Sequence, residues 1–167
     1  MFEKIASFSD EWRASSEQTG KVLDRLTDES LDQPIAPGFR TLGQVAWHIV
    51  TTIPEMGSKI GLRPDAPDEN APVPSSAGKI ADTYRKAAGS LVRQIEKEWT
   101  DENLQAENDM YGLMWKKGFS LLVLLQHEIH HRGQMTVLMR QAGLTVPGVC
   151  GPSKEEWEKM GMAPPEK

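Results

Sequence analysis

The chain has 167 residues, of which 38% are hydrophobic and 26% are charged, and its formal net charge is −5 at pH 7. These values are typical of a single globular domain over residues 1–167, and they exclude an intrinsically disordered or collagen-like chain. No cluster of Lys and Arg residues is longer than the pair Lys116-Lys117. Since a nucleic-acid-binding protein normally carries a basic face, we expect no nucleic-acid partner.

The sequence also disfavours membrane insertion and secretion. The longest purely aliphatic run, residues 121–125, is far too short to cross a bilayer, so we expect no membrane partner. Residues 1–6 carry charge where a signal peptide has an apolar stretch. Cys150 is the only cysteine and cannot form a disulfide within the chain. We therefore expect a cytoplasmic protein that folds on its hydrophobic core alone.

Helical periodicity dominates, and no segment shows a convincing period-two alternation of apolar and polar residues. The apolar spacing predicts four long helices and a short terminal helix that begins near Ser153; the long ones cover approximately residues 3–26, 41–60, 79–99 and 119–142. Residues 61–78 contain four prolines and should form a long connection, either a crossover or a loop that lines the site. Residues 100–117 should form a loop or irregular turns. The pattern predicts an all-α, four-helix bundle.

Local signals predict several helix ends. Thr41 and Gln44 have the spacing of a capping box, in which the two side chains satisfy free backbone N–H groups at a helix start. Ser153 and Glu156 repeat this spacing before the terminal helix. Gly143 stands where a glycine commonly ends a helix.

Three of the four histidines lie between residues 126 and 131. On a helix, His127 and His131 are about 40° apart, so both imidazoles can reach one metal ion, whereas His130 points elsewhere. Apolar side chains share the face of this pair: Leu124, Met135 and Leu138. The two imidazoles should therefore look into the bundle core, where a metal ion would satisfy their ring nitrogens.

His48, the fourth histidine, flanks the apolar stripe of the second predicted helix. A single histidine in such a place is more often an ordinary hydrogen-bonded residue. Together with His127 and His131, however, it would complete a three-histidine site with positions open to water or substrate, as in catalytic metal sites. Gln44 and Gln134 lie about one helical turn from these histidines, and we expect them to orient the imidazoles.

The segment HEIHH, residues 127–131, also matches H-E-x-x-H, the signature of zinc metalloproteases, in which Glu128 would activate water. The longer metzincin signature is absent. A third ligand of another type could come only from the polar terminal segment, from Glu155, Glu156 or Glu158. Such proteases need a substrate-binding sheet, and no strand is predicted. A zinc protease is therefore the weaker alternative, and the simplest role for Glu128 is an exposed helix charge.

Two segments resemble the DinB family of metalloproteins, the DinB/YfiT-like group. They are residues 40–48, RTLGQVAWH, and residues 127–135, HEIHHRGQM, and the pattern continues through residues 138–143 and 146–147. The resemblance spans nearly the whole chain in the order of its elements. It implies an up-down-down-up four-helix bundle with a long crossover between helices 2 and 3, at residues 61–78.

The same resemblance implies a divalent cation, zinc or nickel, on His48, His127 and His131, and a homodimer. Some relatives are thiol S-transferases that use bacillithiol, mycothiol or glutathione, and others resemble hydrolases or isomerases. A small molecule such as a low-molecular-weight thiol is therefore the expected substrate, and the metal would lower the pKa of a thiol or of water. Because a family does not fix a reaction, a non-catalytic, metal-stabilised stress-response binding protein stays open.

The fourth predicted helix is apolar around much of its circumference. One sector that is separate from the histidine face consists of Leu121, Leu122, Leu125 and Ile129. The two sectors together span roughly 200°, whereas a bundle helix normally buries a stripe of about 100° or slightly more. We therefore expect part of this sector to contact a second copy of the chain. Cys150 is not expected to be catalytic, because a lone cysteine is usually inert.

Overall fold

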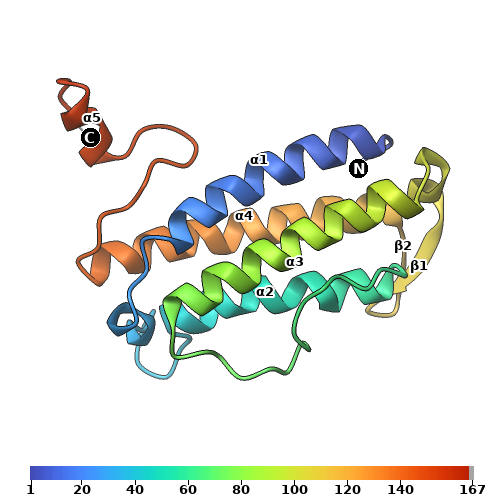
Figure 1. Ribbon diagram of the computed structural model, residues 1–167, viewed down its shortest axis with the longest axis horizontal. Coiled ribbons are helices and arrows are strands. Elements are labelled where there is room, and N and C mark those ends of the chain that lie inside the picture. The colour runs from blue at the N-terminus through green and yellow to red at the C-terminus, as the bar shows by residue number, and fades with distance from the viewer. Residues whose placement is uncertain (166–167) are drawn as a thin grey trace.

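The protein is a bundle of four long helices with a small β-hairpin at one end (Figure 1). The computed structural model describes residues 1–165. The long helices are α1 (Ile5–Leu23), α2 (Leu42–Lys59), α3 (Ala77–Glu98) and α4 (Lys117–Gln141). The shorter elements are η1 (Glu29–Asp32), η2 (Asp101–Gln105), β1 (Glu107–Met110), β2 (Leu113–Lys116) and α5 (Lys154–Lys159). The predicted helical bundle is confirmed, and none of these helices is long and apolar enough to cross a membrane.

The order of the helices is up-down-down-up. In Figure 1, α2 and α3 run in one direction, and α1 and α4 run in the other. Both α1 and α2 pack on α3 and on α4. Residues 60–76 carry the chain back along the outside of the bundle, and Trp47 holds this crossover by donating from Nε1 to the Ala71 carbonyl oxygen at 2.8 Å. The crossover is slightly shorter than predicted because Ser76 caps α3, which makes Ala77 and Gly78 helical.

Three predicted helix ends are formed as the sequence indicates. The Thr41 N–H donates to Gln44 Oε1 at 2.8 Å, and the Gln44 N–H donates to Thr41 Oγ1 at 3.3 Å, which completes the capping box of α2. At α5, the Ser153 N–H donates to Glu156 Oε2 at 3.1 Å, which forms one half of the predicted box. Gly143 follows α4 with a φ of 75°, a left-handed conformation that costs glycine no strain.

The core is built from the apolar stripes of the four long helices. Its largest fully buried side chains include Phe8, Trp12, Ile49, Tyr84 and Leu91. The indole Nε1 of Trp12 donates to the Ala88 carbonyl oxygen at 3.0 Å, so α1 and α3 are joined by a buried hydrogen bond as well as by apolar contact. At the start of α4, Gly118 lies so close to the N-terminal segment that a Cβ would sit 2.0 Å from the Phe2 carbonyl oxygen.

The prediction that the chain has no strand is wrong. Residues 107–110 and 113–116 pair antiparallel, with Glu107 opposite Lys116 and Met110 opposite Leu113. Tyr111 and Gly112 form the two-residue turn, and both have a positive φ, which matches the twist of a tight hairpin. Each strand has only four residues, two of which are exposed, so neither carries a clear alternating pattern of apolar and polar residues.

Candidate metal centre

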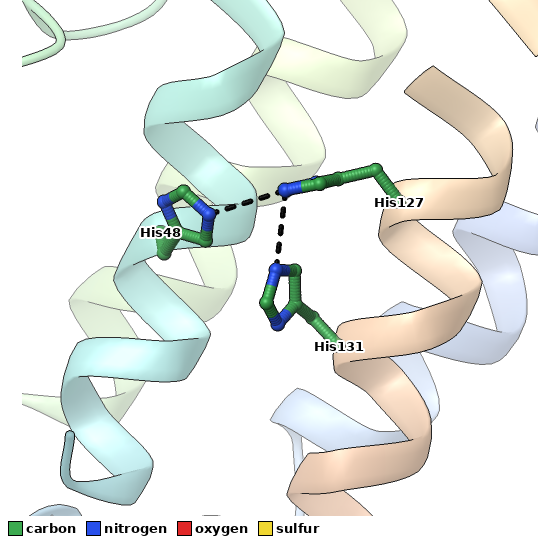
Figure 2. A group of neighbouring side chains, drawn as sticks. All are labelled: His48, His127 and His131. Atoms are coloured by element: carbon green, nitrogen blue, oxygen red, sulfur yellow. Dashed lines mark hydrogen bonds between the residues drawn. The ribbon is translucent and has the colours of Figure 1, made fainter. Parts of the chain in front are cut away.

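His48 on α2 and His127 and His131 on α4 face one another where the two helices pack together (Figure 2). His127 Nε2 lies 3.2 Å from His48 Nε2 and 3.1 Å from His131 Nε2. One donor atom from each of the three residues lies within 4.8 Å of the others. His131 is buried, and the other two are half-buried. The structure therefore brings together the three histidines that the sequence singles out.

The spacing of these nitrogen atoms fits the binding of one ion. Two imidazole nitrogens bound tetrahedrally to one zinc ion at about 2.05 Å would be about 3.3 Å apart. Both separations that involve His127 are close to this value, and the donor atoms of all three residues lie within 4.8 Å of one another. Three imidazoles are a donor set that suits zinc or nickel, and three protein ligands leave a position for water or substrate.

Gln134 sets the orientation of His131. Its Oε1 atom lies 2.7 Å from His131 Nδ1. A carbonyl oxygen only accepts, so Nδ1 carries the proton and the lone pair on Nε2 points to the centre of the cluster. The amide group of Gln134 also donates to Nε2 of the exposed residue His130, at 3.2 Å.

The structure does not place Gln44 on a histidine. Its side chain turns back to the N-terminus of α2, where it accepts from the Thr41 N–H in the capping box. The same glutamine cannot satisfy the cap and orient His48 at once. Gln134 therefore lies where the sequence predicts an orienting residue, and Gln44 does not.

Burial keeps the three imidazoles neutral. It lowers the pKa of His48 and of His127 to about 4, and it lowers the pKa of His131 as well. The positive charge of Arg40, an exposed residue just before α2, adds to this effect on each of the three pKa values. Imidazole must be neutral to bind a metal ion, so the site is in its binding form at pH 7.

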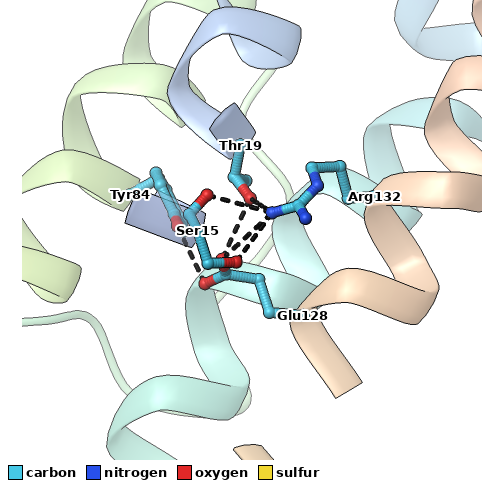
Figure 3. A network of polar contacts seen from close by, with 5 residues as sticks. All are labelled: Ser15, Thr19, Tyr84, Glu128 and Arg132. Carbon is cyan, nitrogen blue, oxygen red and sulfur yellow. Dashed lines mark hydrogen bonds and ion pairs between the residues drawn. The ribbon is translucent and has the colours of Figure 1, made fainter. Parts of the chain in front are cut away.

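Glu128 is buried, and the expectation of an exposed helix charge is wrong (Figure 3). Its carboxylate accepts hydrogen bonds from Ser15 Oγ at 2.9 Å, Thr19 Oγ1 at 3.0 Å and the Tyr84 hydroxyl at 2.8 Å. Burial raises the pKa of Glu128, and these hydrogen bonds together with the nearby Arg132 oppose that rise. Because the carboxylate is committed to α1 and α3, it is not available to activate water at the histidines as the protease signature requires.

The terminal glutamates are also engaged away from the histidines. Glu155 forms an ion pair with Arg140 on α4. Glu156 accepts from the N–H groups of Gly148 and Ser153 at 2.9 and 3.1 Å, and Glu158 is exposed. Within residues 1–165, the three histidines are not joined by a carboxylate. Cys150 is an exposed free thiol in the segment between α4 and α5.

Four buried partners of Glu128 have no predicted role: Ser15, Thr19, Tyr84 and Arg132. One signal for them is present in the sequence. Ser15 and Thr19 are four residues apart on the face of α1 that also carries Phe8 and Trp12, and a polar pair on a buried face needs internal partners. The spacing does not reveal which helix supplies those partners.

Comparisons with known proteins agree with the fold and show the family. The DinB family model matches residues 1–166. The uncharacterized protein YrdA of Bacillus subtilis (strain 168) is 47% identical over 166 residues, covering 99% of each chain. A crystallised DinB-like protein from Bacillus cereus ATCC 10987 is 52% identical with a TM-score of 0.86, covering 89% of this chain and 99% of that one. YjoA, a DinB-like protein of Bacillus subtilis, is 19% identical with a TM-score of 0.67 over 86% of this chain and 97% of its own, which supports the fold alone.

Proposed function

Because this chain belongs to the DinB family, we propose that it binds one divalent cation, zinc or nickel, and acts as a metal-dependent enzyme on a small molecule. The ligands are Nε2 of His48, His127 and His131, and the favoured reaction is transfer of a low-molecular-weight thiol. The proposal rests on the close approach of these nitrogens, since His127 Nε2 lies 3.2 and 3.1 Å from Nε2 of the other two histidines. A structural zinc site normally uses four protein ligands, and three converge here within the part of the chain that is described.

A bound cation would supply Lewis acidity, which lowers the pKa of a thiol or of water at the position that the protein leaves open. The residues of the chain prepare that position. Gln134 holds His131 in the tautomer whose Nε2 is free, and burial keeps His48 and His127 neutral. The exposed Arg40 adds positive charge beside the histidines, which favours an anionic substrate or nucleophile.

Thiol transfer is favoured over hydrolysis because the described residues provide no carboxylate base at the histidines. A thiol has an ordinary pKa of about 8.5, so a modest decrease is enough to ionise it at pH 7. Water needs a much larger decrease and usually a general base, and Glu128 is committed to hydrogen bonds with α1 and α3. Hydrolysis is the second candidate, since the half-buried His48 and His127 leave the site within reach of water.

The test is an activity assay on protein purified without a histidine tag. We expect the protein to consume glutathione, bacillithiol or mycothiol in the presence of an electrophilic acceptor, to lose this activity on chelation and to regain it when metal is restored. His127→Ala should be inactive, and His130→Ala is the matched control because His130 is exposed. A protein that retains its metal and turns over none of the thiols would instead support a non-catalytic, metal-stabilised binding protein.

We also propose that the chain forms a homodimer through the outer face of α4. Ile129 and Val137 are 43% and 59% exposed, and Gly133 between them has open space where a Cβ would be. Of the predicted outer sector, Leu121 and Leu125 are covered within the chain, Leu122 is half-buried and Ile129 is exposed, so the Ile129 end is the part most open to a partner. Exposed apolar side chains around a small residue let a second helix approach closely.

A further inference from the structure

A pair of opposite charges lies in the core of the bundle. Glu128 and Arg132 on α4 are 2% and 3% exposed, and Arg132 Nη1 is 3.7 Å from Glu128 Oε1. Figure 3 shows their side chains reaching toward the residues of α1 and α3. Charged side chains are rarely this buried unless they are paired and hydrogen-bonded.

The hydrogen-bond partners of Glu128 and Arg132 lie on α1 and α3. Arg132 Nη1 donates to the Ser15 carbonyl oxygen at 2.9 Å, to Ser15 Oγ at 2.8 Å and to Thr19 Oγ1 at 3.0 Å. The two hydroxyls of α1 and the hydroxyl of Tyr84 on α3 donate to Glu128. We call these five residues, Ser15, Thr19, Tyr84, Glu128 and Arg132, the core network. It connects α4 to α1 and to α3, including one bond to the backbone of α1.

General stability does not explain such a network. The cost of removing two charges from water offsets most of their attraction, and well-packed apolar residues of similar size often give an equal or greater stability. A hydrogen-bonded charged pair instead fixes the relative positions of the helices that carry it and its partners. Its hydrogen bonds have preferred directions, and a displacement that left a buried charge unpaired would be very costly.

The core network lies beside the histidines, whose relative positions decide whether they can bind one ion. Glu128 and Arg132 each follow one of the paired histidines, His127 and His131, by a single residue. One residue corresponds to about 100° around the helix, so α4 carries two parallel stripes of side chains at i and i+4. The histidine stripe faces His48 on α2, and the charged stripe faces α1 and α3.

We infer that Glu128 and Arg132 are positioning residues that fix the rotation and the axial position of α4, and thereby hold His127 and His131 in register with His48. This inference rests on the proposed metal site. A rotation of α4 that moved the histidines away from α2 would also pull both charges from their partners. A slip by one turn, about 5.4 Å, would break every bond of the core network. An apolar pair would tolerate intermediate rotations, since apolar contacts have no fixed direction.

The test removes the charges without leaving one unpaired. In the triple variant Glu128→Met, Arg132→Met and Tyr84→Phe, both charges and the Tyr84 hydroxyl are replaced by apolar groups of similar size. We expect a folded protein whose affinity for Co²⁺ is about 10-fold to 100-fold lower than that of the wild type. The absorption spectrum of the bound Co²⁺ should also change, because that spectrum reports the arrangement of the ligands. Wild-type affinity together with a wild-type spectrum would overturn the inference.

A control separates positioning from stability. Leu91→Ala removes a fully buried side chain of α3, outside the core network, and should lower the unfolding temperature while leaving Co²⁺ affinity and the Co²⁺ spectrum unchanged. If the triple variant does not fold, Thr19→Val decides the question. It removes the hydroxyl that contacts both charges, and Co²⁺ affinity should fall by about 2-fold to 10-fold. A Thr19→Val protein of lowered stability and unchanged affinity would overturn the inference.

The imidazole ¹⁵N spectra of the metal-free protein distinguish this inference from the proposed function. They report the contact between His127 Nε2 on α4 and His48 Nε2 on α2, which should weaken in Thr19→Val and in the triple variant and persist in Leu91→Ala. A wild-type protein that binds no Co²⁺ would refute the proposed metal site, whereas imidazole spectra that are identical in all variants would refute the positioning role.

Discussion

Acidification should affect metal binding much less than it does at an exposed histidine site. Burial lowers the pKa of His48 and of His127 to about 4. Because the metal competes with protons for each imidazole, the apparent affinity falls only when the pH approaches those values. The lowered pKa values make metal binding more resistant to acid, since they keep the metal-free site neutral and available down to a lower pH.

The loss of affinity on acidification differs greatly between exposed imidazoles of ordinary pKa and the buried imidazoles of this site. An imidazole with the ordinary pKa of about 6.5 is about 97% protonated at pH 5, which weakens binding about 30-fold for each such ligand and about 1000-fold for two. With both pKa values at about 4, each of these imidazoles is only about 10% protonated at pH 5. The affinity should then fall by only a small factor for these two ligands.

Titration of the metal-free protein with Co²⁺ between pH 7 and pH 4.5, followed by absorption, measures this dependence. His130→Ala serves as the control, because it removes the exposed histidine and leaves the three ligands in place. A loss of about 1000-fold or more between pH 7 and pH 5, beginning near pH 6.5, would show that the imidazoles are ordinary solvated groups and would refute the reasoning.

Three other predictions test separate parts of the structure. Casein should stay uncleaved when zinc is supplied, because Glu128 is committed to the core network; metal-dependent cleavage that disappears in Glu128→Gln would contradict this. Light scattering at micromolar concentration should give the mass of two chains and a lower mass for Val137→Asp, whereas a single-chain mass that persists as the concentration rises would exclude the dimer. Gly118→Ala should lower the free energy of unfolding by about 2 kcal/mol in urea denaturation, because its Cβ would overlap the Phe2 carbonyl oxygen; Gly78→Ala, whose Cβ would meet only Ser76 Oγ at 3.8 Å, should not, and equal stability of the two variants would refute this packing argument.

The helices and the histidine cluster are predictable because both depend on local geometry. An apolar stripe with a period of 3.6 residues and a capping pair such as Thr41 and Gln44 can be recognised within one segment. The same holds for His127 and His131, whose four-residue spacing places them on one face of α4. His48 joins them because the apolar stripe of α2 orients that helix toward the core.

The features that sequence reasoning misses depend on contacts between segments. From the sequence of α4 alone, Glu128 resembles a surface charge. Its partners Ser15, Thr19 and Tyr84 lie on other helices, and nothing on α4 indicates them. Gln44 can cap the N-terminus of α2 or orient His48 about one turn further along the helix, and the capping interaction is the one that forms. The hairpin at residues 107–116 is too short to show an alternating pattern, although Gly112 marks its turn.

The metal content of untagged protein and of two variants tests the central claim most directly. Elemental analysis after equilibration with zinc or nickel and removal of free ions should give about one ion per chain for the wild type and for His130→Ala. His131→Ala should retain almost none, since it lacks one of the three converging nitrogens. Full metal content in His131→Ala, together with loss of the metal in His130→Ala, would contradict the assignment of His48, His127 and His131 as the ligands.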